Sequence, residues 1–127
     1  MQVPKEFQAD PPDMSYLRFA FEKAGVQSIA LANTPAVNEA LPLHKQATIS
    51  IRNHIYTTLP TIEEPVEIGG VELYHYAGQV SDSEYVEEYG AIYDGSQISI
   101  NFLLATTGTD AERRELVDSV LATLTFS

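Results

Sequence analysis

Residues 89–104 read YGAIYDGSQISINFLL, and this stretch decides the fold class of the chain. Two runs in which apolar and polar residues alternate flank Asp94-Gly95. A two-residue turn of type I′ needs positive φ at both positions, which is why Asp-Gly is a strong hairpin signal. We therefore predict a β-hairpin. Alternate residues of its second strand then form the core face: Ile98, Ile100, Phe102 and Leu104.

Further strands are predicted on the N-terminal side of this hairpin. Segments with the alternation of half-buried strands lie at 16–21, 27–33, 48–56, 66–68 and 71–77. In the third of them, Ile49, Ile51 and Ile55 would share one face of the strand. Gly69-Gly70 indicates a hairpin turn or a bulge between the last two.

Proline positions predict the irregular parts of the chain. Residues 33–46 and 57–65 each contain proline and are expected to be loops, the first with one helical turn. Residues 1–13, with three prolines, are expected to be an extended lead-in or the stub of a linker. The remainder, 14–127, has the length of a single domain.

The C-terminal segment carries the signals of an amphipathic helix. Thr109 and Glu112 have the spacing of a capping box. The apolar residues that follow recur at steps of three and four: Leu116, Val117, Val120, Leu121 and Leu124. Strands followed by one late helix are typical of the α+β class. We expect an antiparallel sheet of about six strands, with this C-terminal helix packed on one face.

Composition narrows the functional classes. The chain of 127 residues has no cysteine, which excludes disulfides, thiolate metal sites and cysteine catalysis. Eighteen acidic residues against seven Lys and Arg give a net charge of −11, which disfavours nucleic acid and suits a basic protein partner or a cation. No apolar run approaches the ~20 residues that span a bilayer, so we expect no transmembrane segment.

No catalytic, cofactor-binding or metal-binding set can be assembled from the sequence. The three histidines, His44, His54 and His75, lack the spacing of metal ligands. His54 and His75 both fall on predicted strands and would be able to meet across a sheet, and His75 shares the phase of Leu73, which predicts partial burial. There is no nucleophile elbow and no glycine-rich phosphate loop. We expect no cofactor and no enzyme activity.

Tyrosines and acids define one candidate surface. Tyr74 and Tyr76 share a face of one predicted strand, where they either bind a partner or stabilise the sheet as cross-strand pairs. The acidic run 81–88 reads either as a solvated loop, which we favour, or as a site for a basic partner or a divalent cation. The residues predicted to contact a partner are Tyr74, Tyr76, Asp82, Glu84, Glu87 and Glu88.

The C-terminal half resembles a known superfamily. A hairpin on an Asp-Gly turn, followed by a capped helix and the tail VLATLTF at 120–126, is similar to the PsbP-like and DcrB-like α/β sandwich proteins. The similarity lies mainly in residues 66–127, and the N-terminal helix usual in that superfamily is not evident. The resemblance implies a protein that binds without catalysis, because the superfamily includes envelope lipoproteins, photosystem accessory proteins and secretion chaperones. It supplies no catalytic residues.

Three functional readings follow. The first is a non-catalytic accessory or binding domain of a bacterial cell-envelope lipoprotein, outside the cytoplasm and tethered through a removed N-terminal segment. The alternative is an acidic cytoplasmic adaptor, chaperone or toxin-neutralising protein that holds a basic partner. The third is an enzyme or cation-dependent protein that uses residues 82–88 or the histidines. Partner identity and oligomeric state stay open at this point.

Overall fold

The computed structural model describes residues 8–10, 17–23, 27–36, 40–107, 109–122 and 124. Within them the chain forms one antiparallel sheet and two helices, which confirms the α+β class. The elements are β1 (Gln8–Asp10), β2 (Leu17–Lys23), β3 (Gln27–Pro35), α1 (Leu43–Asn53), β4 (Thr61–Ile68), β5 (Val71–Gln79), β6 (Glu84–Tyr93), β7 (Ser96–Ala105) and α2 (Asp110–Leu121). The sheet of the described residues has seven strands, where about six were predicted.

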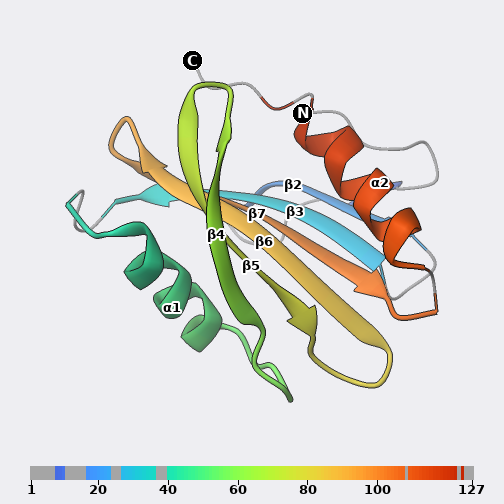
Figure 1. The fold of residues 1–127 in the computed structure, drawn as a ribbon. Coiled ribbons are helices and arrows are strands. Elements are labelled where there is room, and N and C mark those ends of the chain that lie inside the picture. Colours follow the sequence, from blue (N-terminus) through green and yellow to red (C-terminus); the bar gives the residue numbers. More distant parts are fainter. Residues whose placement is uncertain are drawn as a thin grey trace.

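The strand order is β1-β2-β3-β7-β6-β5-β4, with the predicted hairpin near its centre (Figure 1). Strands β6 and β7 pair from Glu84↔Ala105 to Tyr93↔Ser96. At the turn between them Asp94 has φ 50° and Gly95 has φ 78°, so the predicted hairpin on Asp-Gly is confirmed. The pairing of β3 with β7 joins the early strands to this hairpin across a long stretch of sequence.

The predicted strand at 48–56 is wrong, because most of this segment belongs to helix α1. Its buried residues include Ala47 and Ile51, four positions apart as on one helical face. Ile49 is 43% exposed and Ile55 is fully exposed, so the alternation of isoleucines does not define a face. The alternation of isoleucines matches the two-residue period of a strand, but the buried positions of this segment follow the 3.6-residue period of a helix. Strand β3 already pairs with β7, so the central sheet has no vacant position for this segment.

Two predicted loops are also wrong in part. The loop predicted at 57–65 ends early, because β4 begins at Thr61 and includes Pro65. A proline is tolerated there because β4 is an edge strand and its register shifts between Glu63 and Val66. The acidic run 81–88 is not a solvated loop throughout, since β6 begins at Glu84.

The structure confirms other predicted strands, a predicted turn and the predicted helix cap. Strands β2 and β3 cover the segments predicted at 16–21 and 27–33, of which residue 16 lies outside the described residues. Gly69 and Gly70, with φ 60° and 81°, form the turn between β4 and β5. Thr109 accepts a hydrogen bond from the Glu112 amide at 3.1 Å and caps α2 as predicted. Residues 1–7 and 11–13 of the predicted lead-in lie outside the described residues. Its residues 8–10 form β1, which pairs with β2.

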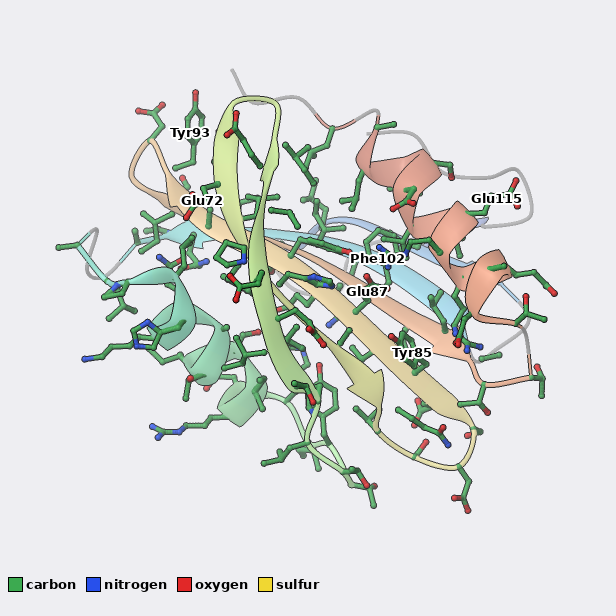
Figure 2. The ribbon with its side chains drawn as sticks, viewed as in Figure 1. Glu72, Tyr85, Glu87, Tyr93, Phe102 and Glu115 are labelled. Atoms are coloured by element: carbon green, nitrogen blue, oxygen red, sulfur yellow. The ribbon has the colours of Figure 1, made fainter. Side chains whose placement is uncertain are left out.

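Each face of the sheet carries its own buried cluster, and the two helices contribute to different clusters. Val117, Val120 and Leu121 of α2 belong to a cluster with Phe102 and Tyr89. Ala47 and Ile51 of α1 belong to the other, whose strand residues are Tyr74, Tyr76, Val86 and the nearby Val80. Because side chains alternate along a strand, neighbouring residues of β6 face different helices. Figure 2 shows Glu87 and Phe102 near the middle of the sheet, while the exposed Glu115 lies on α2.

Candidate functional site

The predicted partner-binding residues do not share one exposed surface. Their positions are now fixed: Tyr74 and Tyr76 on β5, Asp82 in the turn before β6, and Glu84, Glu87 and Glu88 on β6. Glu87 and Glu88 are only 2% and 1% exposed, and Tyr76 is fully buried. Asp82 is exposed and Glu84 half-buried. These residues are therefore spread over both faces of the sheet, because adjacent strand residues point to opposite faces, and their contact with a partner stays a prediction.

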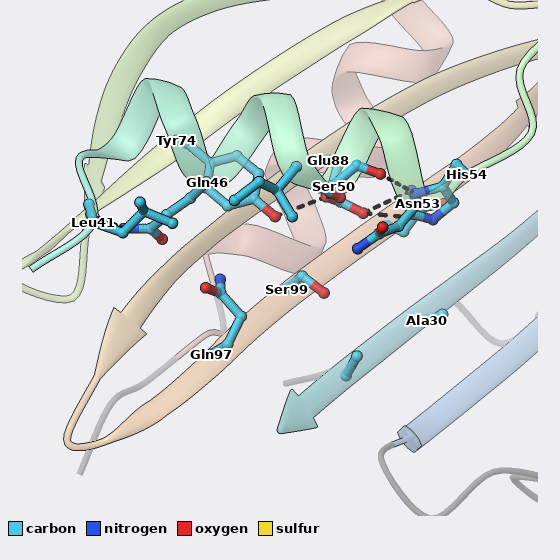
Figure 3. A pocket seen from close by; sticks show the side chains of 13 residues that line it. Ala30, Leu41, Gln46, Ser50, Asn53, His54, Tyr74, Glu88, Gln97 and Ser99 are labelled. Atoms are coloured by element: carbon cyan, nitrogen blue, oxygen red, sulfur yellow. Dashed lines mark hydrogen bonds and ion pairs between the residues drawn. The ribbon is translucent and has the colours of Figure 1, made fainter. Parts of the chain in front are cut away.

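A groove lies between α1 and the sheet on the face that Glu88 occupies. Its cavity measures about 440 Å³ and is lined by residues of α1, β3, β5, β6 and β7 and of the segment before α1. Figure 3 shows Gln46 and Ser50 on α1, and His54 just after its end, above Gln97 and Ser99 on β7. Small side chains on β3, Ala30 and Ala32, contribute to the sheet side of the groove and leave its volume open.

Glu88 is the anionic group of this groove, and hydrogen-bond donors engage both of its carboxylate oxygens. Oε2 accepts from the Tyr74 hydroxyl at 2.7 Å and from the Ser50 hydroxyl. Oε1 accepts from Asn101 Nδ2 at 3.0 Å. Burial first, and then the Glu88 charge, raise the pKa of the Tyr74 hydroxyl well above its usual range. Tyr74 therefore stays protonated and holds the carboxylate in place.

Two more tyrosines extend this network. The Tyr76 hydroxyl lies 3.2 Å from Ser50 Oγ and 3.1 Å from the Tyr56 hydroxyl. The rings of Tyr74 and Tyr76 stack at 6.2 Å, which confirms that they share a face. Burial and the nearby Glu88 charge raise the pKa of Tyr76 as well. The hydroxyl network thus fixes the wall of the groove in one arrangement.

Ser50, His54 and Glu88 are the residue types of a hydrolytic triad, but they are connected differently. In a triad the serine hydroxyl bonds to histidine, which bonds to the acid. Here the Ser50 hydroxyl donates directly to Glu88. His54 Nδ1 bonds to the Ser50 carbonyl oxygen at 2.7 Å, so Nδ1 is the donor. His54 Nε2 lies 4.0 Å from Glu88 Oε1. His54 is therefore not bonded to the Ser50 hydroxyl, and the serine-histidine-acid relay of a triad is not formed among these three residues.

Glu87, on the opposite face, is the centre of a separate buried ion cluster. It accepts hydrogen bonds from Tyr89 and from Arg114 of α2, and His75 Nε2 lies 3.0 Å away. Burial alone would raise the pKa of Glu87, but hydrogen bonds from His75, Arg114 and Tyr89 outweigh it and lower the pKa to about 2. His75 is 13% exposed, which confirms its predicted partial burial. Glu87 therefore ties α2 to the sheet.

The Glu87 cluster predicts how stability depends on pH. A pKa of about 2 in the folded protein, against 4.5 ordinarily, means that Glu87 stabilises the fold above pH 4.5 and loses this contribution as pH falls towards 2. The contribution is about 3 kcal/mol. In Glu87→Gln it is absent, so urea unfolding should show the gap from the wild type narrowing between pH 7 and pH 2.5. The exposed Glu115→Gln should follow the wild type, and a constant gap for Glu87→Gln would contradict the assignment.

His54 and His75, which a shared sheet would have allowed to meet, lie apart. His54 caps the end of α1 and lies near Glu88, whereas His75 contacts Glu87 on the other face. Among the described residues there is no group of three or more His, Asp or Glu side chains arranged to hold a metal ion. The described residues also include no helix with the length and apolar character needed to cross a membrane.

Residues of α1 were missed as site residues because the segment was read as a strand. Gln46, Ser50 and His54 recur every fourth position, which places them along one side of a helix. Read with the helical period, this spacing would have put three polar side chains next to the buried Ala47 and Ile51. The signal was present in the sequence, but the β-branched isoleucines at 49, 51 and 55 favoured the other reading.

Comparison with known proteins identifies the fold but no family. No protein-family model matches the sequence, and no curated protein matches it either. A crystal structure from Bacteroides thetaiotaomicron VPI-5482 superposes with a TM-score of 0.55 at 12% sequence identity. The match covers 92% of this chain and 42% of that one, so the present chain spans less than half the length of its structural neighbour. At this identity the likeness concerns the fold alone.

Proposed function

We propose that this chain is a non-catalytic binding domain whose ligand occupies the groove between α1 and the sheet. The observation that carries the proposal is the state of Glu88, whose two oxygens accept from Tyr74, Ser50 and Asn101. A carboxylate that accepts from three side chains is held in one position, as a group that recognises a ligand must be. The groove is thus preorganised to recognise a ligand, and its Ser50, His54 and Glu88 are not connected as in a catalytic triad.

The dimensions and lining of the groove support the same proposal. Its volume of about 440 Å³ falls within the range of roughly 300–1,000 Å³ found for small-molecule sites. Apolar side chains such as Leu41 and Ile49 alternate there with polar ones. Sites of this kind gain affinity from the apolar surface and orientation from a few placed polar groups. The hydroxyl network of Glu88 keeps these groups in position before a ligand arrives.

Filling the groove should abolish binding without unfolding the protein. Ala30 is half-buried and lines the groove on β3, so Ala30→Phe would occupy part of the cavity. We expect mixtures of small polar metabolites to shift backbone amide resonances of residues 46–54 and 97–101 in the wild type. Ala30→Phe should lose these shifts at an unchanged melting temperature, while Thr107→Phe, at an exposed site outside the groove, should keep them.

The same NMR samples test the absence of catalysis. A binding domain leaves the ligand signals unchanged over a day at 25 °C, whereas an enzyme replaces them with product signals. Amide shifts that are the same in the wild type and in Ala30→Phe would place the ligand elsewhere and overturn the groove as the site. Disappearance of the ligand signals in the wild type, but not in Ser50→Ala, would show that the groove is catalytic.

We further propose, on the sequence resemblance, that the domain belongs to a bacterial cell-envelope lipoprotein of PsbP-like type. In that setting a groove open to solvent would capture a ligand outside the membrane. Reading the gene upstream of codon 1 tests the proposal. A leader with a lipidation cysteine would support it, and a natural start at Met1 would instead favour the acidic cytoplasmic adaptor that binds a basic partner.

A further inference from the structure

We infer that the groove binds an organic cation bearing N–H donors, such as a primary ammonium or a guanidinium group. This inference rests on the proposed binding function of the groove and specifies the ligand class. It follows from the acceptors that line the groove; Asn53 and Ser99, which also line it, can donate as well as accept.

Three side-chain amides that line the groove, those of Gln46, Gln97 and Asn101, each donate to another group of the protein. Gln46 Nε2 donates to the Leu41 carbonyl at 2.7 Å, and Gln97 Nε2 donates to the Ala91 carbonyl at 3.3 Å. Asn101 Nδ2 donates to Glu88 at 3.0 Å. Each of these residues lines the groove, and each amide has an oxygen to which no described residue donates.

Gln46 gives the strongest indication, because its oxygen is buried. The residue is 6% exposed, and Oε1 has no hydrogen-bond partner within the part of the chain that the structure describes. A buried acceptor without a partner costs about 1–3 kcal/mol, so native proteins supply a partner to nearly all of them. For Gln46 the cavity is where such a donor would be placed, and a ligand N–H group meets the requirement.

His54 and Glu88 form a second acceptor pair at the other end of α1. Because His54 Nδ1 donates to the Ser50 carbonyl, neutral His54 presents Nε2 as an acceptor. Nε2 lies 4.0 Å from Glu88 Oε1, too far for a hydrogen bond between them. An ammonium group has three donors and a guanidinium five, so either would bond to both atoms at once.

The charge of the site agrees with a cationic ligand. None of the described residues that line the groove is Lys or Arg, and Glu88 supplies a buried negative charge. The chain as a whole carries −11, which attracts cations to its surface. A metal ion fits less well, because no three His, Asp or Glu side chains of the described residues converge. The amide oxygens would instead orient N–H donors of an organic molecule.

Three probes with the same four-carbon spacer separate charge from hydrogen bonding. Putrescine carries two ammonium groups, its bis(trimethylammonium) analogue has the same charge without N–H donors, and 1,4-butanediol has donors without charge. We expect putrescine to shift the amides of α1 and β7 and to bind at least about tenfold more tightly than either analogue. Ala30→Phe keeps the net charge, so loss of the shifts in this variant separates groove binding from general attraction to an acidic surface.

Variants of the amides test the acceptor argument directly. Gln46→Met preserves side-chain length but removes Oε1, and should weaken putrescine about tenfold. Gln97→Met, at a more exposed position, provides the same test if Gln46→Met does not fold. Equal affinity for putrescine and its quaternary analogue, or tighter binding of butanediol, would overturn the inference while leaving the groove as a binding site. If no probe or metabolite shifts the groove amides, the proposed function itself fails.

Discussion

Leu121→Asp is expected to leave no cooperatively folded protein at 25 °C. Leu121 is 8% exposed and belongs to the buried cluster that α2 shares with the sheet. The substitution removes about 1.5–3 kcal/mol of apolar burial and places an unpaired carboxylate among apolar side chains, which costs several kcal/mol more. A domain of this size has a total stability of about 5–15 kcal/mol. Urea unfolding followed by circular dichroism should show no transition.

Ser119→Asp is the matched control, because it adds the same charge to an exposed position of α2. It should change the free energy of unfolding by less than about 1 kcal/mol, the effect of a charge near the helix end. If Leu121→Asp melted cooperatively near the wild-type midpoint, Leu121 would not be part of the core, and the position of α2 on the sheet would have to be revised.

Gly90→Val is expected to lower the free energy of unfolding by about 3–5 kcal/mol and to disrupt the groove. Gly90 pairs with Tyr74 across β5 and β6, and a Cβ at Gly90 would lie 2.5 Å from Tyr74 Cζ. Tyr74 is 2% exposed, so its ring has little room to move. Displacing the ring would also break the 2.7 Å hydrogen bond to Glu88. Urea unfolding measures the loss, and amide resonances of 46–54 should report the change in the groove.

Two further variants identify the cause of this loss. Gly70→Ala meets no atom within 4 Å but has a φ of 81°, so it should cost only about 1 kcal/mol of backbone strain and leave the groove unchanged. In Gly90→Val/Tyr74→Leu the smaller side chain makes room for valine. The double variant should be more stable than the sum of the single changes predicts, by at least about 1 kcal/mol. Strict additivity would show that the Tyr74 ring is not what requires glycine at position 90.

Local signals were sufficient wherever a few neighbouring residues determine the backbone. Asp94-Gly95 predicted its hairpin because positive φ is a property of those two residues, observed at 50° and 78°. Thr109 predicted the start of α2 because its hydroxyl caps an amide only three residues away. These elements depend little on the rest of the chain, so the sequence predicts them directly.

Tertiary structure decided the parts that make up the site. The segment with Ile49 and Ile51 is a helix, and the place beside β7 is taken by β3, which comes from a distant part of the sequence. The run of acidic residues at 81–88 predicted a solvated loop, yet Glu87 and Glu88 are buried on opposite faces of the sheet. Their burial is stable only because partners from α1, α2, β5, β6 and β7 meet them in space.

The α+β class, the central hairpin, the capped helix and the acidic charge can all be predicted from the amino-acid sequence. Each of these follows from residues adjacent in the chain or from composition alone. The groove and the hydrogen-bond partners of Glu88 depend on contacts between distant segments of the chain. A buried polar group needs partners with matched geometry, and those partners come from strands and helices whose pairing no local pattern specifies.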